Sequence, residues 1–226
     1  MHIGVGIVIG AISYFLGSIP FGLILVKLKT GQDVRKIQSG RTGGTNAMRA
    51  AGLSIGVATA LLDLFKGTCS VWLAKWVVPD IFWIHTLAPV MVIIGHNYSV
   101  FLIDRDENGK LQFHGGAGGA SSAGGSMGLW TPIMLFILPV ALFILYFVGY
   151  ASLATLSAPI ITTVVFFVLA WMGILPWSYV FYGIFAGFLL AWALRPNIRR
   201  LLNGSERLIG LRAKRREKSN PPGNQD

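Results

Sequence analysis

Six long apolar runs dominate the sequence, and each is long enough to cross a lipid bilayer as a helix. A bilayer core of about 30 Å is spanned by about 20 helical residues. Only 12% of the 226 residues are charged, whereas soluble domains are about 25% charged. The sequence therefore predicts an all-α, multi-pass membrane protein with its main helices over residues 3–26, 53–78, 82–102, 132–148, 152–173 and 177–194.

The basic residues indicate how these helices are oriented. Loop 27–49 and the segment after residue 194 hold 15 of the 19 lysines and arginines, and cytoplasmic loops are enriched in these residues. If both segments face the cytoplasm, residues 117–148 must cross the membrane twice. As one helix they would run about 48 Å, well beyond a bilayer core of about 30 Å. We therefore expect seven transmembrane helices, with a short fourth one over 117–131, the N-terminus outside and the C-terminus in the cytoplasm.

The apolar runs use nearly the whole chain, so we expect residues 1–210 to form a single membrane domain. No basic residue precedes the first run, which favours a membrane helix over a cleaved signal peptide. Residues 211–226 are basic and polar, and we expect them to form a disordered tail. Loop 27–49, loop 103–116 and the start of the tail then face the same side, where we expect the functional site.

Residues 39–49 read SGRTGGTNAMR. The glycines permit tight turns and close backbone approach, and Thr45 and Asn46 are favourable N-cap residues for a helix that begins there. Backbone N–H groups at a helix start, with Arg41 and Arg49 nearby, form a plausible anion site. The alternative is a capped loop whose arginines contact lipid head groups.

Two further segments place polar groups in or near the membrane. In LDLFKG, Asp63 and Lys66 are three residues apart and share one helix face; charges inside a span are costly and usually face a cavity. In GHNYSVFL, His96 lies at the expected cytoplasmic end of the third helix, where an imidazole can act as a base or as a hydrogen-bond donor. The alternative for Asp63 and Lys66 is a structural ion pair, and the alternative for His96 is a structural histidine at the membrane interface.

The loop IDRDENGKLQF, residues 103–113, contains a strong hairpin signal in Asn108-Gly109. Asp104, Asp106 and Asn108 also fit the start of a calcium-binding loop. The twelfth position of such a loop is Gly115, where a bidentate glutamate is required. We therefore expect a plain hairpin, with calcium binding as the alternative.

The glycine-rich stretch HGGAGGASSAGG, residues 114–125, follows this loop. Such a stretch can either approach a phosphate or form a small-residue helix surface for close packing, and its residues leave both alternatives open. In RPNIRRLLNG, we expect Pro196 to end the last helix and Asn197 to point back toward the membrane interface. The arginines there are expected to be cytoplasmic residues in contact with lipid phosphates.

These segments together resemble a family of bacterial membrane acyltransferases that acylate glycerol 3-phosphate from acyl phosphate. The family's Ser-Gly-Asn-x-Gly-Ala-Thr-Asn is similar to SGRTGGTN at 39–46. Its Asp-x-x-Lys-Gly is found at 63–67, and its Gly-His-Asn followed by Phe-Leu at 95–102. Gly-Tyr-x-Ser-Leu and Arg-Pro-Asn-Ile recur at 149–153 and 195–198. The similarity covers nearly the whole chain.

The resemblance implies a reaction in which the 1-hydroxyl of glycerol 3-phosphate attacks the carbonyl of acyl phosphate. Lysophosphatidic acid and inorganic phosphate are then the products. It implies no cofactor, no metal and no nucleic-acid partner; the partners are the two substrates and membrane lipids. It also implies the bacterial cytoplasmic (inner) membrane as the location. A transporter or lipid-phosphate binding protein on the same scaffold, and a catalytically silent homologue, are the alternatives.

The resemblance also implies roles for individual residues. Catalytic roles fall to Asn46, Asp63, Lys66 and His96. Substrate or phosphate binding falls to Ser39, Gly40, Arg41, Thr45, Arg49, Asn97, Gly115, Gly116, Gly118, Ser121 and Asn197.

The chain departs from the family pattern at two places. Where the family has Gly-Gly-Lys-Gly, this chain has Ala117 in place of the lysine. The hairpin 103–113 is an insertion. We expect Arg41 or Lys110 to replace the missing cation.

Overall fold

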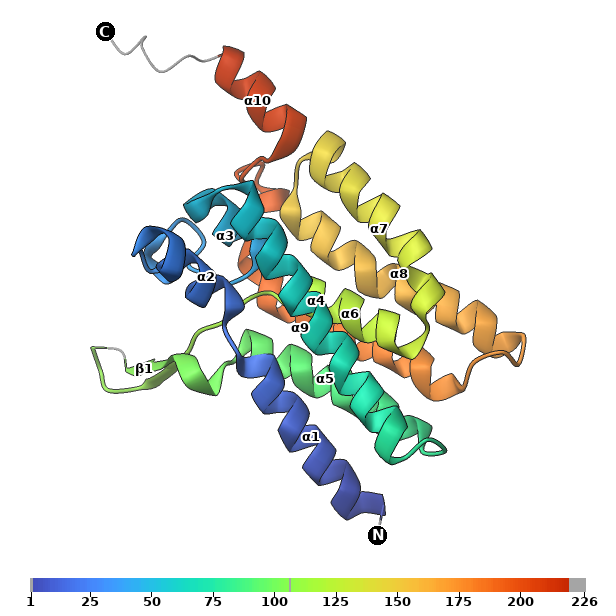
Figure 1. Cartoon of the computed structure of the whole chain (residues 1–226). Coiled ribbons are helices and arrows are strands. Elements are labelled where there is room, and N and C mark those ends of the chain that lie inside the picture. Colours follow the sequence, from blue (N-terminus) through green and yellow to red (C-terminus); the bar gives the residue numbers. More distant parts are fainter. Residues whose placement is uncertain (1, 106, 220–226) are drawn as a thin grey trace, which may run out of the picture.

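The computed structural model describes residues 2–105 and 107–219, which form a bundle of helices with a small hairpin at its edge (Figure 1). Six helical segments of these residues are long and apolar enough to cross a membrane. They confirm the prediction of a mostly helical, multi-pass membrane protein. These segments are His2–Thr30, Leu53–Val77, Phe82–Leu102, Thr131–Val148, Ala151–Trp171 and Trp177–Leu202.

The predicted helices from residue 53 onward begin within one or two residues of the observed ones. Helix α3 begins earlier than expected, at Gly44 with Gly43 as N-cap, so neither Thr45 nor Asn46 caps it. The elements, in chain order, are α1 (His2–Ser18), α2 (Phe21–Thr30), η1 (Val34–Lys36), α3 (Gly44–Ala51), α4 (Leu53–Val77), α5 (Phe82–Asn97), η2 (Val100–Leu102), β1 (Ile103–Arg105), β2 (Leu111–Phe113), α6 (Gly119–Leu129), η3 (Thr131–Ile133), α7 (Met134–Phe143), η4 (Ile144–Val148), α8 (Ala151–Trp171), α9 (Trp177–Leu202) and α10 (Gly210–Ser219).

The first apolar run, predicted as one helix over 3–26, is broken into α1 and α2 at Ile19 and Pro20. Proline disfavours the helical conformation in the residue before it. Carbonyl groups at such a break have lost their helical partners. Two of them, on Gly17 and Ile19, accept hydrogen bonds from Lys66 Nζ at 2.9 and 3.3 Å. A side chain of α4 therefore stabilises the break.

Helix α6 lies at the centre of the bundle, in contact with α4, α5, α7, α8 and α9. Its 11 residues run about 16 Å, since a helix rises 1.5 Å per residue. Small residues let it approach α4 closely. A side-chain carbon on Gly67 would collide with the Ser121 carbonyl, and one on Gly124 with the Leu64 carbonyl. The second half of the glycine-rich stretch thus serves helix packing, one of the two alternatives that its residues leave open.

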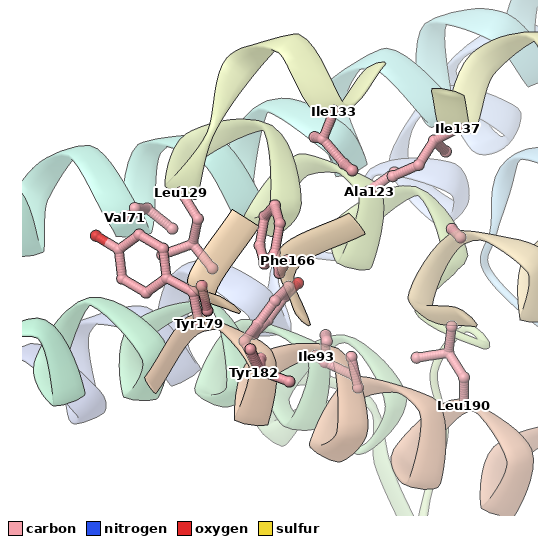
Figure 2. Close-up of a cluster of buried hydrophobic side chains, with 14 residues drawn as sticks. Val71, Ile93, Ala123, Leu129, Ile133, Ile137, Phe166, Tyr179, Tyr182 and Leu190 are labelled. Carbon is pink, nitrogen blue, oxygen red and sulfur yellow. The ribbon is translucent and has the colours of Figure 1, made fainter. Parts of the chain in front are cut away.

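Apolar side chains from α4, α5, α6, α8 and α9 meet in a core around Phe166 and Tyr182 (Figure 2). Tyr182 is fully buried, and its hydroxyl donates a hydrogen bond to the Ser122 carbonyl at 2.8 Å, because a buried polar group requires a partner. The outer faces of the helices expose many large apolar side chains, such as Leu135 at 75%. Lipid accommodates such faces, whereas water does not.

The C-terminal region is more helical than expected. We expected Pro196 to end the last membrane helix, but α9 continues to Leu202. A proline loosens the turn before it, since it lacks an N–H donor and its ring clashes with a preceding carbonyl. In that turn, the Ala193 carbonyl accepts a hydrogen bond from Arg41 Nη2 at 2.5 Å. The tail expected to be disordered from residue 211 forms α10 as far as Ser219, and residues 220–226 lie outside the described part.

Strands β1 and β2 form the predicted hairpin. They are antiparallel, with Ile103 opposite Phe113 and Arg105 opposite Leu111. Gly109 in the connection has a φ of 73°, a conformation that glycine adopts without steric cost.

The calcium alternative gains no support from the hairpin. Among the described residues, no group of three or more His, Cys, Asp or Glu side chains is placed to hold a metal ion. Asp104 pairs instead with Arg35, at 3.0 Å. Asp106 lies outside the described residues, and Asn108 lies in the turn of the hairpin.

Candidate active site

A cavity of about 510 Å³ opens where loop 31–43, segment 97–116 and the end of α9 meet. The backbone N–H of Thr42 donates to the Gly115 carbonyl at 3.2 Å, and the Arg41–Ala193 hydrogen bond joins the loop to α9. The predicted convergence of the polar segments is confirmed. Of the predicted substrate-binding residues, the cavity wall contains Ser39, Gly40, Arg41, Asn97, Gly115 and Gly116.

The cavity wall carries more positive than negative charge. The two acids among its described residues, Asp33 and Asp104, both pair with Arg35, at 2.7 and 3.0 Å. The hydrogen bonds from Arg35 hold the pKa of Asp33 below its usual range, so that carboxyl is ionised at neutral pH. Three more cations line the wall, and an anion would balance their charge: Lys36, Arg41 and Arg195.

Arg41 is partly buried in this wall. Burial and the positive charge of Arg200 lower the pKa of Arg41, because both disfavour the charged form. An arginine nevertheless remains protonated at neutral pH. With less competing water, its charge gains more from a bound anion than the charge of an exposed arginine would.

Asn97 places an unpaired amide at the cavity. The residue is only 6% exposed, and neither its Oδ1 nor its Nδ2 has a hydrogen-bond partner within the described residues. A buried polar group left without partners costs about 1–3 kcal/mol. Asn97 also lines the cavity, so a turn of its side chain would bring the buried amide to a ligand hydroxyl, which both donates and accepts.

Next to the cavity wall, α4 and α5 bring Asp63, Lys66 and His96 into a buried cluster. Lys66 Nζ lies 2.8 Å from Asp63 Oδ1 and 2.8 Å from His96 Nδ1. The distance from His96 Nδ1 to Asp63 Oδ1 is 3.5 Å. The predicted pairing of Asp63 with Lys66 is confirmed, and His96 joins the pair from a neighbouring helix.

The contacts of Lys66 indicate which nitrogen of His96 carries the proton. An ammonium group has three donors and no acceptor, so a charged Lys66 donates to Nδ1, and the proton lies on Nε2. This tautomer is assigned from the bonding partners, since hydrogens are inferred. His96 then presents Nε2–H as a hydrogen-bond donor on the side of Gly116, which is its close neighbour.

The first half of the glycine-rich stretch wraps around His96 and Asn97. The N–H of Gly116 donates to the His96 carbonyl at 2.9 Å. A side-chain carbon on Gly115 would collide with the His96 and Asn97 carbonyls, and one on Gly116 with the His96 ring at Nε2. Glycine is needed at these two positions because the backbone approaches another residue so closely.

Gly116→Ala is expected to lower the activity of the folded protein about 100-fold. The added methyl group would push the His96 ring from its place, and a misplacement of about 1 Å in an active site costs about 10²-fold in rate. Gly4→Ala is the matched control, because nothing lies within 4 Å of the added carbon. Turnover per folded molecule is the measurement; equal values for the two variants would contradict the role of this contact.

Asn46 organises the loop from within α3. Its Nδ2 group donates to the carbonyls of Val34, Ile37 and Arg41, at 3.0, 3.0 and 2.9 Å. The side chain is only 3% exposed and is absent from the cavity wall. These contacts make Asn46 a positioning residue for the loop that carries Ser39 and Arg41.

The model of the family described as glycerol-3-phosphate acyltransferase matches residues 7–204. The chain belongs to this family. The glycerol-3-phosphate acyltransferase of Syntrophomonas wolfei is 34% identical over 196 residues, which cover 87% of this chain and 93% of that protein. One from Thermus thermophilus is 34% identical over 206 residues, covering 91% of this chain and 96% of that protein.

Two crystal structures of family members have the same fold. One is the glycerol 3-phosphate form of PlsY (YgiH), an integral membrane glycerol 3-phosphate acyltransferase, with a TM-score of 0.79 and 33% identity. It covers 91% of this chain and 96% of that chain. The other is the lysophosphatidic acid form, with a TM-score of 0.76, 32% identity and coverage of 91% and 95%.

Five residues for which the resemblance implies substrate binding are not among the residues that line the cavity. Two of them, Thr45 and Arg49, are on α3. Burial and the positive charge of Arg207 lower the pKa of Arg49. Asn197 donates to Glu206 Oε1 at 2.7 Å. The remaining two are on the inner side of the glycine-rich stretch: Gly118 and Ser121.

The sequence reasoning missed the contribution of α9 to the cavity. Trp192 and Arg195 line it, with the Arg195 guanidinium carbon 4.2 Å from the centre of the Trp192 ring. Their spacing of three residues on a helix predicts such a contact. The sequence instead favours lipid phosphates as the partners of Arg195. Glu206, which binds Asn197 and Arg200, was missed as well.

Proposed function

We propose that the chain transfers a fatty acyl group from acyl phosphate to the 1-hydroxyl of glycerol 3-phosphate. The products are lysophosphatidic acid and inorganic phosphate. The observation that carries this proposal is the cavity, which combines three cations that are not paired with its acids with the unpaired amide of Asn97. A small substrate with a phosphate at one end and hydroxyls at the other complements both features.

The phosphate groups would bind at the basic side of the cavity. Arg41 and Arg195 offer planar guanidinium groups that match two phosphate oxygens at once, and Ser39 offers a hydroxyl. These residues line the same cavity. Electrostatic stabilisation of this kind is usually the largest contribution of an active site to rate.

The acyl transfer itself needs positioning more than a protein nucleophile, because acyl phosphate is an activated mixed anhydride. The 1-hydroxyl oxygen attacks the carbonyl carbon, the bond from that carbon to the bridging oxygen breaks, and phosphate leaves with the hydroxyl proton. With its proton on Nε2, His96 would act as a donor that orients a substrate oxygen. Lys66 would hold the ring in that tautomer by donating to Nδ1, and Asp63 would hold the Lys66 ammonium group in place.

Seven membrane crossings are part of this proposal, with α6 as the short fourth one. The distribution of basic residues supports an external N-terminus and a cytoplasmic C-terminus. The cavity would then open to the cytoplasm, where glycerol 3-phosphate is soluble, and the protein would lie in the bacterial inner membrane. Residues 1–210 would form its single membrane domain.

A comparison of acyl donors tests the function. The purified full chain in detergent is given glycerol 3-phosphate with acyl phosphate, acyl coenzyme A or acyl carrier protein, and lysophosphatidic acid is quantified. We expect product from acyl phosphate. Product from acyl coenzyme A alone would refute the donor, and no product from any of the three would refute the enzymatic function.

Arg41→Gln is expected to raise the KM for glycerol 3-phosphate about 10- to 150-fold, with a smaller effect on kcat. A hydrogen bond to a charged group contributes about 1.5–3 kcal/mol, and 1.4 kcal/mol is a factor of ten. Adding Ala117→Lys to this variant should lower the KM again. Steady-state kinetics in both substrates measures this.

The control for this series is Arg105→Gln, because Arg105 is exposed on the hairpin and lies outside the cavity wall. Its KM should stay within about twofold of the wild-type value, as for most surface charges. An unchanged KM in Arg41→Gln would mean that Arg195 or Lys36 holds the phosphate instead.

A further inference from the structure

A second cavity, of about 420 Å³, lies where α10 meets the bundle. Its wall includes Tyr150, Leu208 and three arginines of α10, at positions 212, 215 and 216. Among the described residues, it shares none of its lining with the candidate active site. The three arginines also lie beyond the family match, which ends at residue 204.

The contacts of α10 fix its arginines at this cavity. Residues three and four apart are neighbours on a helix surface, so the three arginines share one face. Arg212 Nη1 donates to the Val148 carbonyl at 3.2 Å, and its guanidinium carbon lies 5.2 Å from the centre of the Tyr150 ring. A backbone bridge between Tyr150 and Leu208 holds the connection to α10 beside the start of α8 (Figure 1).

The positive charge of this face exceeds the negative charge nearby. Glu206 is the acidic residue in the described part of the cavity wall. Its carboxylate already accepts hydrogen bonds from Asn197 at 2.7 Å and from Arg200 at 3.2 Å, and its side chain is only 4% exposed. It therefore balances the charge of Arg200 on α9. Arg215 has no ion pair within the described residues, which leaves its charge for a ligand.

The position of the cavity points to the chemistry of that ligand. It lies at the turn between the apolar segments Thr131–Val148 and Ala151–Trp171. Beside this turn, Tyr146 and Phe147 are 51% and 54% exposed. Head groups of lipids lie at this level of a bilayer, and basic clusters next to a span attract anionic lipids.

We propose that this second cavity binds a phosphate group, carried by an anionic lipid head group or present as free phosphate. The guanidinium groups of Arg212 and Arg215 match phosphate oxygens in pairs. The exposed aromatic side chains would lie along the acyl chains of a bound lipid. The site is distinct from the cavity in which acyl transfer is proposed.

Native mass spectrometry of the full chain tests the site, with phosphatidic acid, phosphatidylcholine and inorganic phosphate titrated in turn. Arg215 makes no hydrogen bond or ion pair within the described residues, so Arg215→Gln leaves the docking of α10 intact. We expect it to weaken binding of phosphatidic acid or inorganic phosphate about 10-fold, as one charged hydrogen bond does. Weaker binding of the lipid identifies a head group as the source, and weaker binding of phosphate alone identifies the free anion.

The matched control is Arg199→Gln, because Arg199 is an exposed arginine of α9 that lines neither cavity. Its affinities should stay within about twofold of wild type. Equal affinities in wild type and Arg215→Gln, or equal losses in both variants, would overturn the proposal. Acyl transfer in neutral detergent should be unchanged in both variants, so the outcome is independent of the proposed activity.

Discussion

Lys66→Met is expected to lower the free energy of unfolding by about 3–5 kcal/mol, the cost of removing one partner from a buried ion pair. Lys66 is 1% exposed and Asp63 is 2% exposed. Without the ammonium group, the Asp63 carboxylate, the His96 ring and the Gly17 and Ile19 carbonyls would lose their shared donor. Unfolding in a mixed-micelle denaturant titration measures this loss.

Two controls distinguish the cost of leaving a buried charge unpaired from the cost of losing a lysine and its hydrogen bonds. Lys75, on the same helix, donates to the Gly128 and Leu129 carbonyls at 2.9 Å, and no acid faces it in an ion pair within the described residues. Lys75→Met should therefore cost only about 1–2 kcal/mol. Asp63→Asn combined with Lys66→Met should recover part of the stability, because no unpaired charge remains. If Lys75→Met lowered the free energy of unfolding as much as Lys66→Met does, this explanation would be wrong.

His96→Ala is expected to lower kcat about 10²–10³-fold, the usual cost of removing one preorganised hydrogen-bond donor from an active site. The KM for glycerol 3-phosphate should change much less, because the proposed phosphate ligands are arginines of the cavity wall, of which His96 is not a lining residue. Steady-state kinetics on purified, folded variant gives both values. Activity within about threefold of wild type would exclude His96 from the reaction.

His85→Ala is the matched control for this prediction. His85 is also buried on α5, where its ring contacts the Val78 carbonyl at 2.8 Å and the Tyr179 hydroxyl at 3.0 Å. It lies eleven residues from His96, or about 16 Å along the helix. Its replacement should lower stability and leave kcat per folded molecule unchanged.

Much of this architecture follows from the sequence by simple rules. Helix α4 was expected over 53–78 and is Leu53–Val77, because a long apolar run bounded by polar turns has few other folds available in a membrane. The pairing of Asp63 with Lys66 follows from helical spacing alone. The hairpin 103–113 was expected from Asn108-Gly109, but Arg105 pairs with Leu111, so a longer connection replaces the two-residue turn that Asn-Gly favours.

What the sequence did not reveal depends on how helices pack. The contact between Lys66 and His96 requires a particular register of α4 against α5, and Gly116 then closes on the ring. Proline was a poor guide to helix ends. Pro20 broke a helix predicted to be continuous, whereas Pro196 lies inside one. In each case a side chain from elsewhere, Lys66 or Arg41, bonds to a carbonyl near the proline.

The most direct test of the proposed one-step transfer is to measure both products and the mass of the chain in one reaction. Purified protein is mixed with acyl phosphate, with and without glycerol 3-phosphate. We predict lysophosphatidic acid and phosphate in equal amounts, formation that depends on glycerol 3-phosphate, and an unchanged chain mass. Phosphate released without lysophosphatidic acid, or a chain heavier by one acyl group, would contradict direct transfer in this cavity.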